Sequence, residues 1–246
     1  MFDLTTLLLA ACLFAGAALY TSVGYAGASA YIAAMALFGV APTVMRPTAL
    51  ALNILVASFA SVRYYRANLF DWRTLWPFLV GSVPFAFVGG SIQLPGTFYG
   101  PLVGVVLLIS GVRLLWPGGL KASVNPTHPP VWAGVLCGML IGLLSGLTGT
   151  GGGIFLSPIL LLVGWSDPRT ASGVAAAFIL SNSIAGLLGN VAMVKALPSE
   201  LWIFAIAVVL GAAVGTSFGI KWRPATVLRA LGALLVIAGL KLIGVY

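Results

Sequence analysis

The sequence predicts an all-α membrane protein with about eight to ten transmembrane or half-spanning helices in two inverted-topology repeats. Three observations predict this fold class. Hydrophobic residues make up 61% of the 246 positions and charged residues only 7%, whereas a soluble domain carries roughly 25% charged residues. The chain divides into apolar segments, two of which follow glycine-bearing breaks. The order of small and polar residues in the first half recurs in the second half.

Ten apolar segments follow one another with short connections, which leaves no room for a second, soluble domain. They fall at about 4–23, 26–39, 47–65, 74–91, 99–116, 131–148, 151–164, 171–194, 201–219 and 225–244. A full span needs roughly 20 helical residues. Segments 26–39 and 151–164 are too short for that, so each is expected to form a broken or re-entrant pair with the segment before it.

The two halves of the chain match in the order of their residues. A shift of 125 positions aligns Cys12 with Cys137, Gly24 with Gly149, Gly27 with Gly152, Gly39 with Gly164 and Ser58 with Ser183. Each half has five segments, and an odd number inverts the second copy in the membrane. We therefore predict a first repeat at 1–116, a linker at 117–130 and a second repeat at 131–246.

Basic residues are concentrated in loops that the predicted topology places on one side of the membrane. The loops at 63–73, 116–130 and 220–224 carry six of the 12 basic residues, and Arg113 and Arg169 lie on the same side. Cytoplasmic loops are the ones enriched in Lys and Arg. Both termini are then external. The net charge of +8 does not indicate nucleic-acid binding, because the basic residues are scattered singly at the ends of segments.

The stretch from Ser145 to Pro158 carries five glycines inside an otherwise apolar half. Glycine lowers the cost of leaving the helix and of positive φ. Non-helical backbone at membrane depth is tolerated only where protein buries it or where it lines a watery cavity. A helix that begins after the break would point unpaired N–H groups and its positive dipole end at that cavity, which favours an anion.

Candidate substrate-binding residues lie at both breaks and on the segments after them. The first break supplies Ser22, Gly24, Tyr25, Gly27 and Ser29, and the second supplies Thr148, Gly149, Thr150, Gly151, Gly152 and Gly153. Asn53, Asn182 and Ser183 interrupt apolar runs, where a polar group either ties helices together or meets solute. Arg46 and Arg169 open the same two segments; they can attract an anion, but interfacial anchoring is their expected role.

Two glycine stripes are expected to serve helix packing rather than substrate binding. Glycines that recur every four residues leave one bare face on a helix, along which another backbone can approach closely. They are Gly134, Gly138, Gly142 and Gly146 in one segment and Gly211, Gly215 and Gly219 in another.

The chain offers no predicted catalytic, cofactor or metal site. Its four acids are expected at segment ends, and its only histidine, His128, lies in the linker. A proton relay usually uses a buried carboxylate or histidine, a serine nucleophile needs a base within reach, and a metal needs a cluster of ligands. The sequence therefore predicts that the protein is not an enzyme.

The sequence resembles the TauE/SafE family of membrane proteins, often called sulfite exporters. The resemblance lies in the block Gly149-Thr150-Gly151-Gly152-Gly153 with Pro158 after it, in Arg169-Thr170-Ala171-Ser172, and in the layout of the whole chain. It implies transport of sulfite, sulfonates or organic acids across a bacterial inner membrane, around a site between two related halves. The family often has a second glycine-rich block in the first half, where this sequence has Tyr25. A larger or aromatic anion is therefore as good a candidate substrate as sulfite.

We expect a secondary transporter of small anions that works by alternating access. An anion channel and a membrane scaffold subunit without transport of its own remain the alternatives. The partners expected are a small anionic solute and membrane lipid, with no nucleic acid, and a homodimer is left open.

The predicted topology can be tested with a reporter that matures only in the cytoplasm. Fused after Tyr246, it should stay dark, because the positive-inside distribution places this terminus outside. The same reporter inserted in the 63–73 loop is the control and should be bright. A bright signal from the terminal fusion would contradict the topology.

Overall fold

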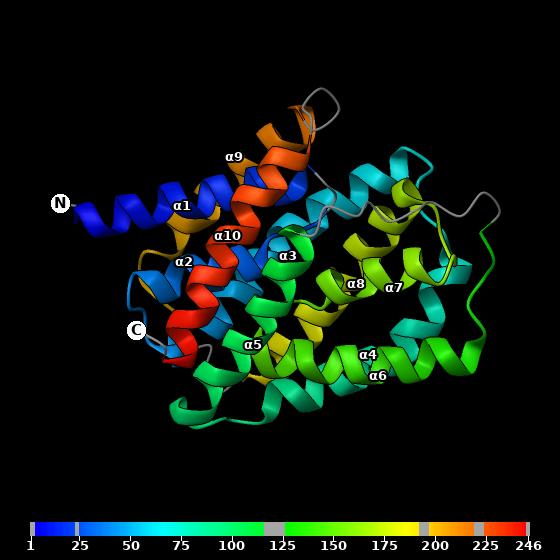
Figure 1. Cartoon of the computed structure of the whole chain (residues 1–246), viewed down its shortest axis with the longest axis horizontal. Helices are drawn as coiled ribbons and strands as arrows, with labels where there is room; N and C mark the ends of the chain where they lie inside the picture. Colours follow the sequence, from blue (N-terminus) through cyan, green and yellow to red (C-terminus); the bar gives the residue numbers. More distant parts are fainter. Residues whose placement is uncertain (1–2, 23–24, 116–125, 192–196, 219–223, 245–246) are drawn as a thin grey trace.

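The computed structural model describes residues 3–22, 25–115, 126–191, 197–218 and 224–244. These ranges form ten helices and no strand, which confirms the all-α fold class (Figure 1). The helices are α1 Leu4–Thr21, α2 Ala28–Leu37, α3 Pro42–Arg66, α4 Trp72–Ser91, α5 Gly96–Leu115, α6 Val131–Thr148, α7 Gly153–Leu162, α8 Pro168–Gly189, α9 Leu201–Phe218 and α10 Pro224–Ile243. Six of them are long and apolar enough to cross a membrane.

Each half contains the long-then-short helix pair that the breaks predict. Helix α1 ends at Thr21 and α2 begins at Ala28, while α6 ends at Thr148 and α7 begins at Gly153. Helices α2 and α7 have 10 residues each, which at about 1.5 Å per residue is roughly half of a bilayer core about 30 Å thick. A helix of this length cannot cross the bilayer core on its own.

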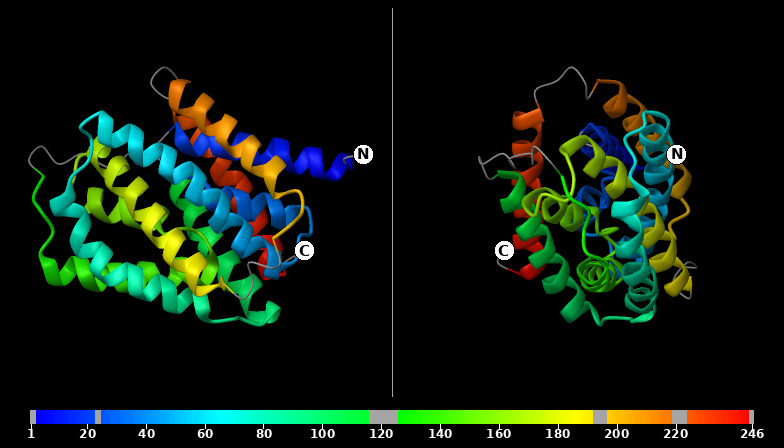
Figure 2. Two further views of the ribbon diagram at one scale, coloured as in Figure 1. Left: turned by 180° about the vertical axis from the view of Figure 1, so that it is seen from behind. Right: turned by 90° about the vertical axis from the view of Figure 1, so that its right-hand side faces the viewer.

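Five helix pairs account for most of the packing, one of which is α4 with α8. Helices α4 and α6 run side by side in the same direction, as do α1 and α9, which lie along one edge of the molecule (Figure 2). Helices α3 and α8 pack antiparallel, and so do α5 and α10. If α1 to α5 are matched in order with α6 to α10, the α4–α6 pair corresponds to the α9–α1 pair. The α3–α8 and α5–α10 pairs each correspond to themselves.

The glycine stripes lie where α4 meets α6 and where α1 meets α9, as expected. A methyl group added at Gly142 would lie 2.3 Å from the carbonyl oxygen of Ser82, and one at Gly138 would lie 2.3 Å from that of Phe78. Gly215 faces the carbonyl of Ala18 in the same way. Lipid tails are as apolar as side chains, so this close backbone contact is what holds such helices together. Gly219 lies outside the described residues.

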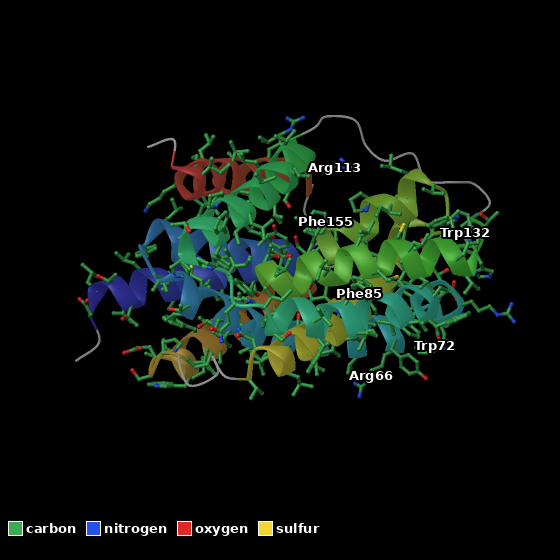
Figure 3. The ribbon with its side chains drawn as sticks, turned by 90° about the horizontal axis from the view of Figure 1, so that it is seen from below. Arg66, Trp72, Phe85, Arg113, Trp132 and Phe155 are labelled. Carbon is green, nitrogen blue, oxygen red and sulfur yellow. The ribbon has the colours of Figure 1, made fainter. Side chains whose placement is uncertain are left out.

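The short helix α2 and the middle of α3 and α8 occupy the interior. Every residue of α2 from Ala28 to Ala36 is buried, whereas α4 and α6 expose large apolar side chains along their outer faces. Their first turns carry the exposed Trp72 and Trp132, which lie at the same end of the molecule (Figure 3). Tryptophan is enriched at the membrane–water interface, so this end of the bundle is a membrane boundary.

Two buried mid-helix glycines give a matched test of the stripe. Gly142→Ala should lower the melting temperature in detergent, because the new methyl group meets the α4 backbone, and overpacking of this kind costs about 1–3 kcal/mol. Gly186→Ala is the control: its methyl group would meet only atoms at 3.6 Å or beyond. The control should be neutral or stabilising, since Ala favours the helix by about 1 kcal/mol over Gly. Equal effects of the two changes would contradict the close contact.

Candidate functional site

The second break is a left-handed turn that only glycine forms without strain. Gly149, Gly151 and Gly152 have φ values of 85°, 76° and 77°, a region that L-residues with a side chain rarely enter. The backbone N–H groups of Gly151, Gly152, Gly153 and Ile154 find no acceptor among the described residues. The N–H groups of Gly153 and Ile154 are among the free donors that open every α-helix, and those of Gly151 and Gly152 lie in the turn directly before α7.

Polar side chains of α3 and α8 lie against this turn. The Asn53 amide donates from Nδ2 to the Ser183 hydroxyl at 2.9 Å. A methyl group at Gly151 would lie 2.3 Å from Asn53 Nδ2 and 3.1 Å from Ser183 Oγ, so the turn and this pair touch directly. Both side chains are completely buried. Asn182 beside them donates to the Phe178 carbonyl, and the amide oxygens of both asparagines find no donor in the described part of the chain.

The end of α6 supports the turn from the other side. The Thr148 hydroxyl donates to the Leu144 carbonyl at 2.6 Å and lies 3.0 Å from the Thr150 hydroxyl. The Tyr99 hydroxyl of α5 donates to the Thr148 carbonyl at 3.0 Å. These bonds fix the last turn of α6. None of them uses the N–H groups of Gly151 to Ile154.

At the first break, internal hydrogen bonds occupy the candidate hydroxyls. Ser29 pairs with the Tyr20 hydroxyl, and the Ser22 hydroxyl donates to the Leu19 carbonyl at 2.7 Å. Gly27, with φ of 101°, supplies the left-handed residue before α2. Gly24 lies outside the described residues. These two serines therefore stiffen the first break in this structure and do not present free hydroxyls to a solute.

The two breaks lie close together. Tyr25 from the first break and Ile154 from the first turn of α7 both pack on Tyr20 and Ala30, and Ala30 lies in the first turn of α2. The N-terminal ends of the two short helices thus meet in one region. Each end carries a partial positive charge from its helix dipole.

The two candidate arginines lie at opposite ends of the bundle, because α3 and α8 are antiparallel. Arg169 is exposed at the start of α8, where the Asp167 carboxylate accepts the N–H groups of Arg169 and Thr170. Partial burial raises the pKa of Asp167, but the hydrogen bonds from Thr170 and Arg169 outweigh it and lower that pKa below its ordinary value. Arg169 therefore lies at the start of α8, away from the breaks.

Arg46 does not anchor the chain at the interface, so that expectation is wrong. Its side chain is only 5% exposed. The guanidinium turns inward and donates to the carbonyls of Ile92 at 2.9 Å, of Gly89 at 2.6 Å, and of Gly90. Those carbonyls end α4, where the helix dipole is negative, and this attraction holds the arginine inside. Its aliphatic stem lies against Gly149, so the structure brings Arg46 to the second break.

Comparison with known proteins agrees with this architecture. A family model described as sulfite exporter TauE/SafE matches residues 8–242. The chain belongs to the TauE/SafE family. The probable membrane transporter protein y4hK of Sinorhizobium fredii is 38% identical over 239 residues, which cover 96% of this chain and 97% of that protein. No solved structure matches the chain.

Membership of the TauE/SafE family, together with the six apolar helices, makes the chain a multi-pass membrane protein and indicates transport rather than catalysis. No group of three or more potential metal ligands occurs among the described residues. The sequence pattern did not single out Tyr99 or Asn190, which lie beside Arg46. A tyrosine inside an apolar segment was the available signal for Tyr99, since a buried hydroxyl usually finds a partner.

The contact between Asn53 and Ser183 can be tested in this TauE/SafE protein with two serines of one helix. Ser183→Ala should lower the free energy of unfolding by about 1–3 kcal/mol, because it leaves a buried amide donor unpaired. Ser181→Ala is the control, since the Ser181 hydroxyl bonds only to the Ala177 carbonyl of its own helix; its effect should be smaller. Thermal denaturation in detergent measures both, and equal losses would contradict the contact.

Proposed function

We propose that this protein is a secondary transporter of small anions, namely sulfite, organosulfonates or related organic acid anions. Transport works by alternating access around a site between the two repeats, across a bacterial inner membrane. The observation that carries this proposal is a row of four N–H groups, Gly151 to Ile154, in the turn before α7 and in its first turn, which find no acceptor in the described part of the chain.

The charge distribution around the breaks supports an anion as the solute. The positive ends of α2 and α7 meet, and Arg46 lies beside the second break with its charge buried. Each of the four acidic residues directly precedes a helix. They are Asp3 before α1, Asp71 before α4, Asp167 before α8 and Glu200 before α9. An interior with positive groups and no opposing carboxylate attracts negative charge.

The residues that we assign to the solute path come from both breaks and from α3, α6 and α8. Backbone N–H groups of Gly151, Gly152 and Gly153 provide the anion cradle. Asn53, Asn182 and Ser183 flank it from α3 and α8, and Thr148, Gly149 and Thr150 form its rim. From the first break we assign Tyr25, Gly27, Ser29, Ser22 and Gly24 to the opposite wall, which Ser22 and Ser29 shape through their bonds to protein groups, and we assign Arg169 to the far mouth.

The exchange of helix pairs supports an inverted repeat, with 1–116 and 131–246 as the two halves. In that arrangement α3 and α8 are equivalent helices that pack antiparallel across the pseudo-two-fold axis, and the two breaks approach from opposite sides. Secondary transporters with inverted repeats bind solute at such discontinuous helices and rock the halves around the site. Both termini are then external.

The alternatives are an anion channel and a scaffold subunit, and reconstitution separates them. Purified protein in liposomes should give sulfite flux that saturates with concentration. Flux that rises without saturation and carries current would indicate a channel. No flux of sulfite, methanesulfonate or acetate with any imposed gradient would contradict transport by this chain alone.

Gly152→Val tests the cradle in the same liposomes. The change should abolish flux, because valine disfavours a φ of 77° and its side chain would meet Ile141 and Phe178. Gly164→Val is the matched control: Gly164 has a φ of 76° at the far end of α7, so it carries the same backbone strain without touching the break. The control should insert and transport, and normal flux in Gly152→Val would contradict the proposal.

A further inference from the structure

A cavity of about 220 Å³ opens beside the second break, between the turn before α3, the loop after α4 and the end of α8. Arg46, Gln93, Tyr99 and Asn190 form its polar lining, and Pro42 and Leu94 contribute an apolar wall. Its volume is below the range of about 300–1,000 Å³ typical of pockets for drug-sized ligands. The cavity therefore suits a small molecule with a polar end and a short apolar body.

The positive charge of Arg46 has no counter-charge in the described structure. The only ion pair among the described residues joins His128 to Asp71, and Asp71 precedes α4 at the end opposite Arg46. All three acceptors of the guanidinium are neutral carbonyls, and its Nε–H is buried with no partner. Burying a charge is costly unless an opposite charge and hydrogen bonds compensate for it. The three carbonyls supply part of that compensation. The Nε–H group of Arg46 still has no acceptor and its positive charge has no negative partner among the described residues.

We infer that this cavity is an entrance site for a small organic oxyanion, a carboxylate or sulfonate with a short apolar body, whose charged group is the counter-ion of Arg46. The inference rests on the proposed function and deepens it, because it places a second binding site on the route to the cradle. The apolar wall of Pro42 and Leu94 takes the body of the solute, and this wall distinguishes an organic anion from sulfite.

The cavity and the cradle share a wall. The Arg46 stem lies beside Gly149, where an added methyl group would be 3.2 Å from Arg46 Cγ, and the Tyr99 hydroxyl holds the Thr148 carbonyl. An anion at Arg46 is therefore next to the residues that begin the break. In the orientation proposed above, this cavity is the external mouth, and Arg46 passes the solute inward to the free N–H groups of α7.

Asn190→Asp tests the entrance site with little change in shape. Asn190 is buried in the cavity wall, and a carboxylate there provides Arg46 with a permanent counter-ion. We expect the KM for methanesulfonate, added on the cavity side of oriented vesicles, to rise at least tenfold. The KM measured from the opposite side should stay within about twofold of the wild type, which a general loss of structure would not produce.

Asn68→Asp is the control for the change in charge alone. Asn68 also follows the last turn of a helix, but it lies after α3, at the far end from Arg46. It is exposed, so the same change in charge lies outside the cavity and both KM values should remain unchanged. If Asn190→Asp does not fold, Gln93→Glu on the exposed rim of the cavity delivers the carboxylate from another element, and the same one-sided rise is expected.

The outcomes separate this inference from the proposed function. Wild-type flux with no one-sided change in either variant would overturn the entrance site and leave the transporter standing. A wild type without any anion flux would overturn the proposed function. Sulfite serves as the second probe: an organic anion should compete from the cavity side at lower concentration than sulfite, and equal or weaker competition would contradict the role of the apolar wall.

Discussion

Lipid cannot hydrogen-bond a free backbone N–H, and the structure of this protein depends on how two interrupted helices meet that constraint. Each interruption leaves the first donors of a half-length helix without an internal partner. At the first break, Tyr20 and Tyr31 bond to Ser29 and to the Ala26 carbonyl, which fixes the turn. At the second break the donors at Gly151 to Ile154 stay free. The N–H groups of Ala28 to Ala30 also find no acceptor among the described residues. The second break differs because Asn53, Ser183 and Arg46 lie against it, and this makes it the better place for an anion.

Burying these breaks requires helices that approach one another very closely. The glycine faces of α6 and α9 let the backbones of α4 and α1 come into direct contact, and these outer pairs enclose α2, α3 and α8. The same arrangement brings the negative end of α4 to Arg46, which can then stay inside the bundle. The positive interior is therefore a consequence of helix packing, and a single guanidinium connects the end of α4, the start of the break and the cavity beside it.

Much of this fold follows from local features of the sequence. The run Gly151-Gly152-Gly153 lies in an otherwise apolar sequence and predicts a break in the helix. Because the run is only three residues long, it also predicts where the turn lies. The four-residue spacing of Gly134 to Gly146 predicts a bare helix face without any knowledge of the partner. The lengths of segments 26–39 and 151–164 predict half-helices, because helix rise and bilayer thickness are constants.

The side-chain arrangement at the site depends on tertiary contacts that the sequence does not display. Arg46 stands near the end of an apolar segment, as an interfacial anchor would, and only the folding of α4 brings the carbonyls of Gly89 and Gly90 to it. Ser22 and Ser29 have the composition of solute ligands, yet both bond to protein groups. Asn53 and Ser183 are 130 positions apart, and their contact depends on how α3 and α8 cross.

The most direct measurement is an experimental structure of the protein with selenite, an analogue of sulfite whose selenium can be located by anomalous scattering. We expect a selenium peak at the start of α7, with its oxygens about 3 Å from the N–H groups of Gly151 to Ile154, the usual length of such hydrogen bonds. Selenium peaks confined to the protein surface, with those four N–H groups bonded to protein atoms, would contradict an anion site at the break.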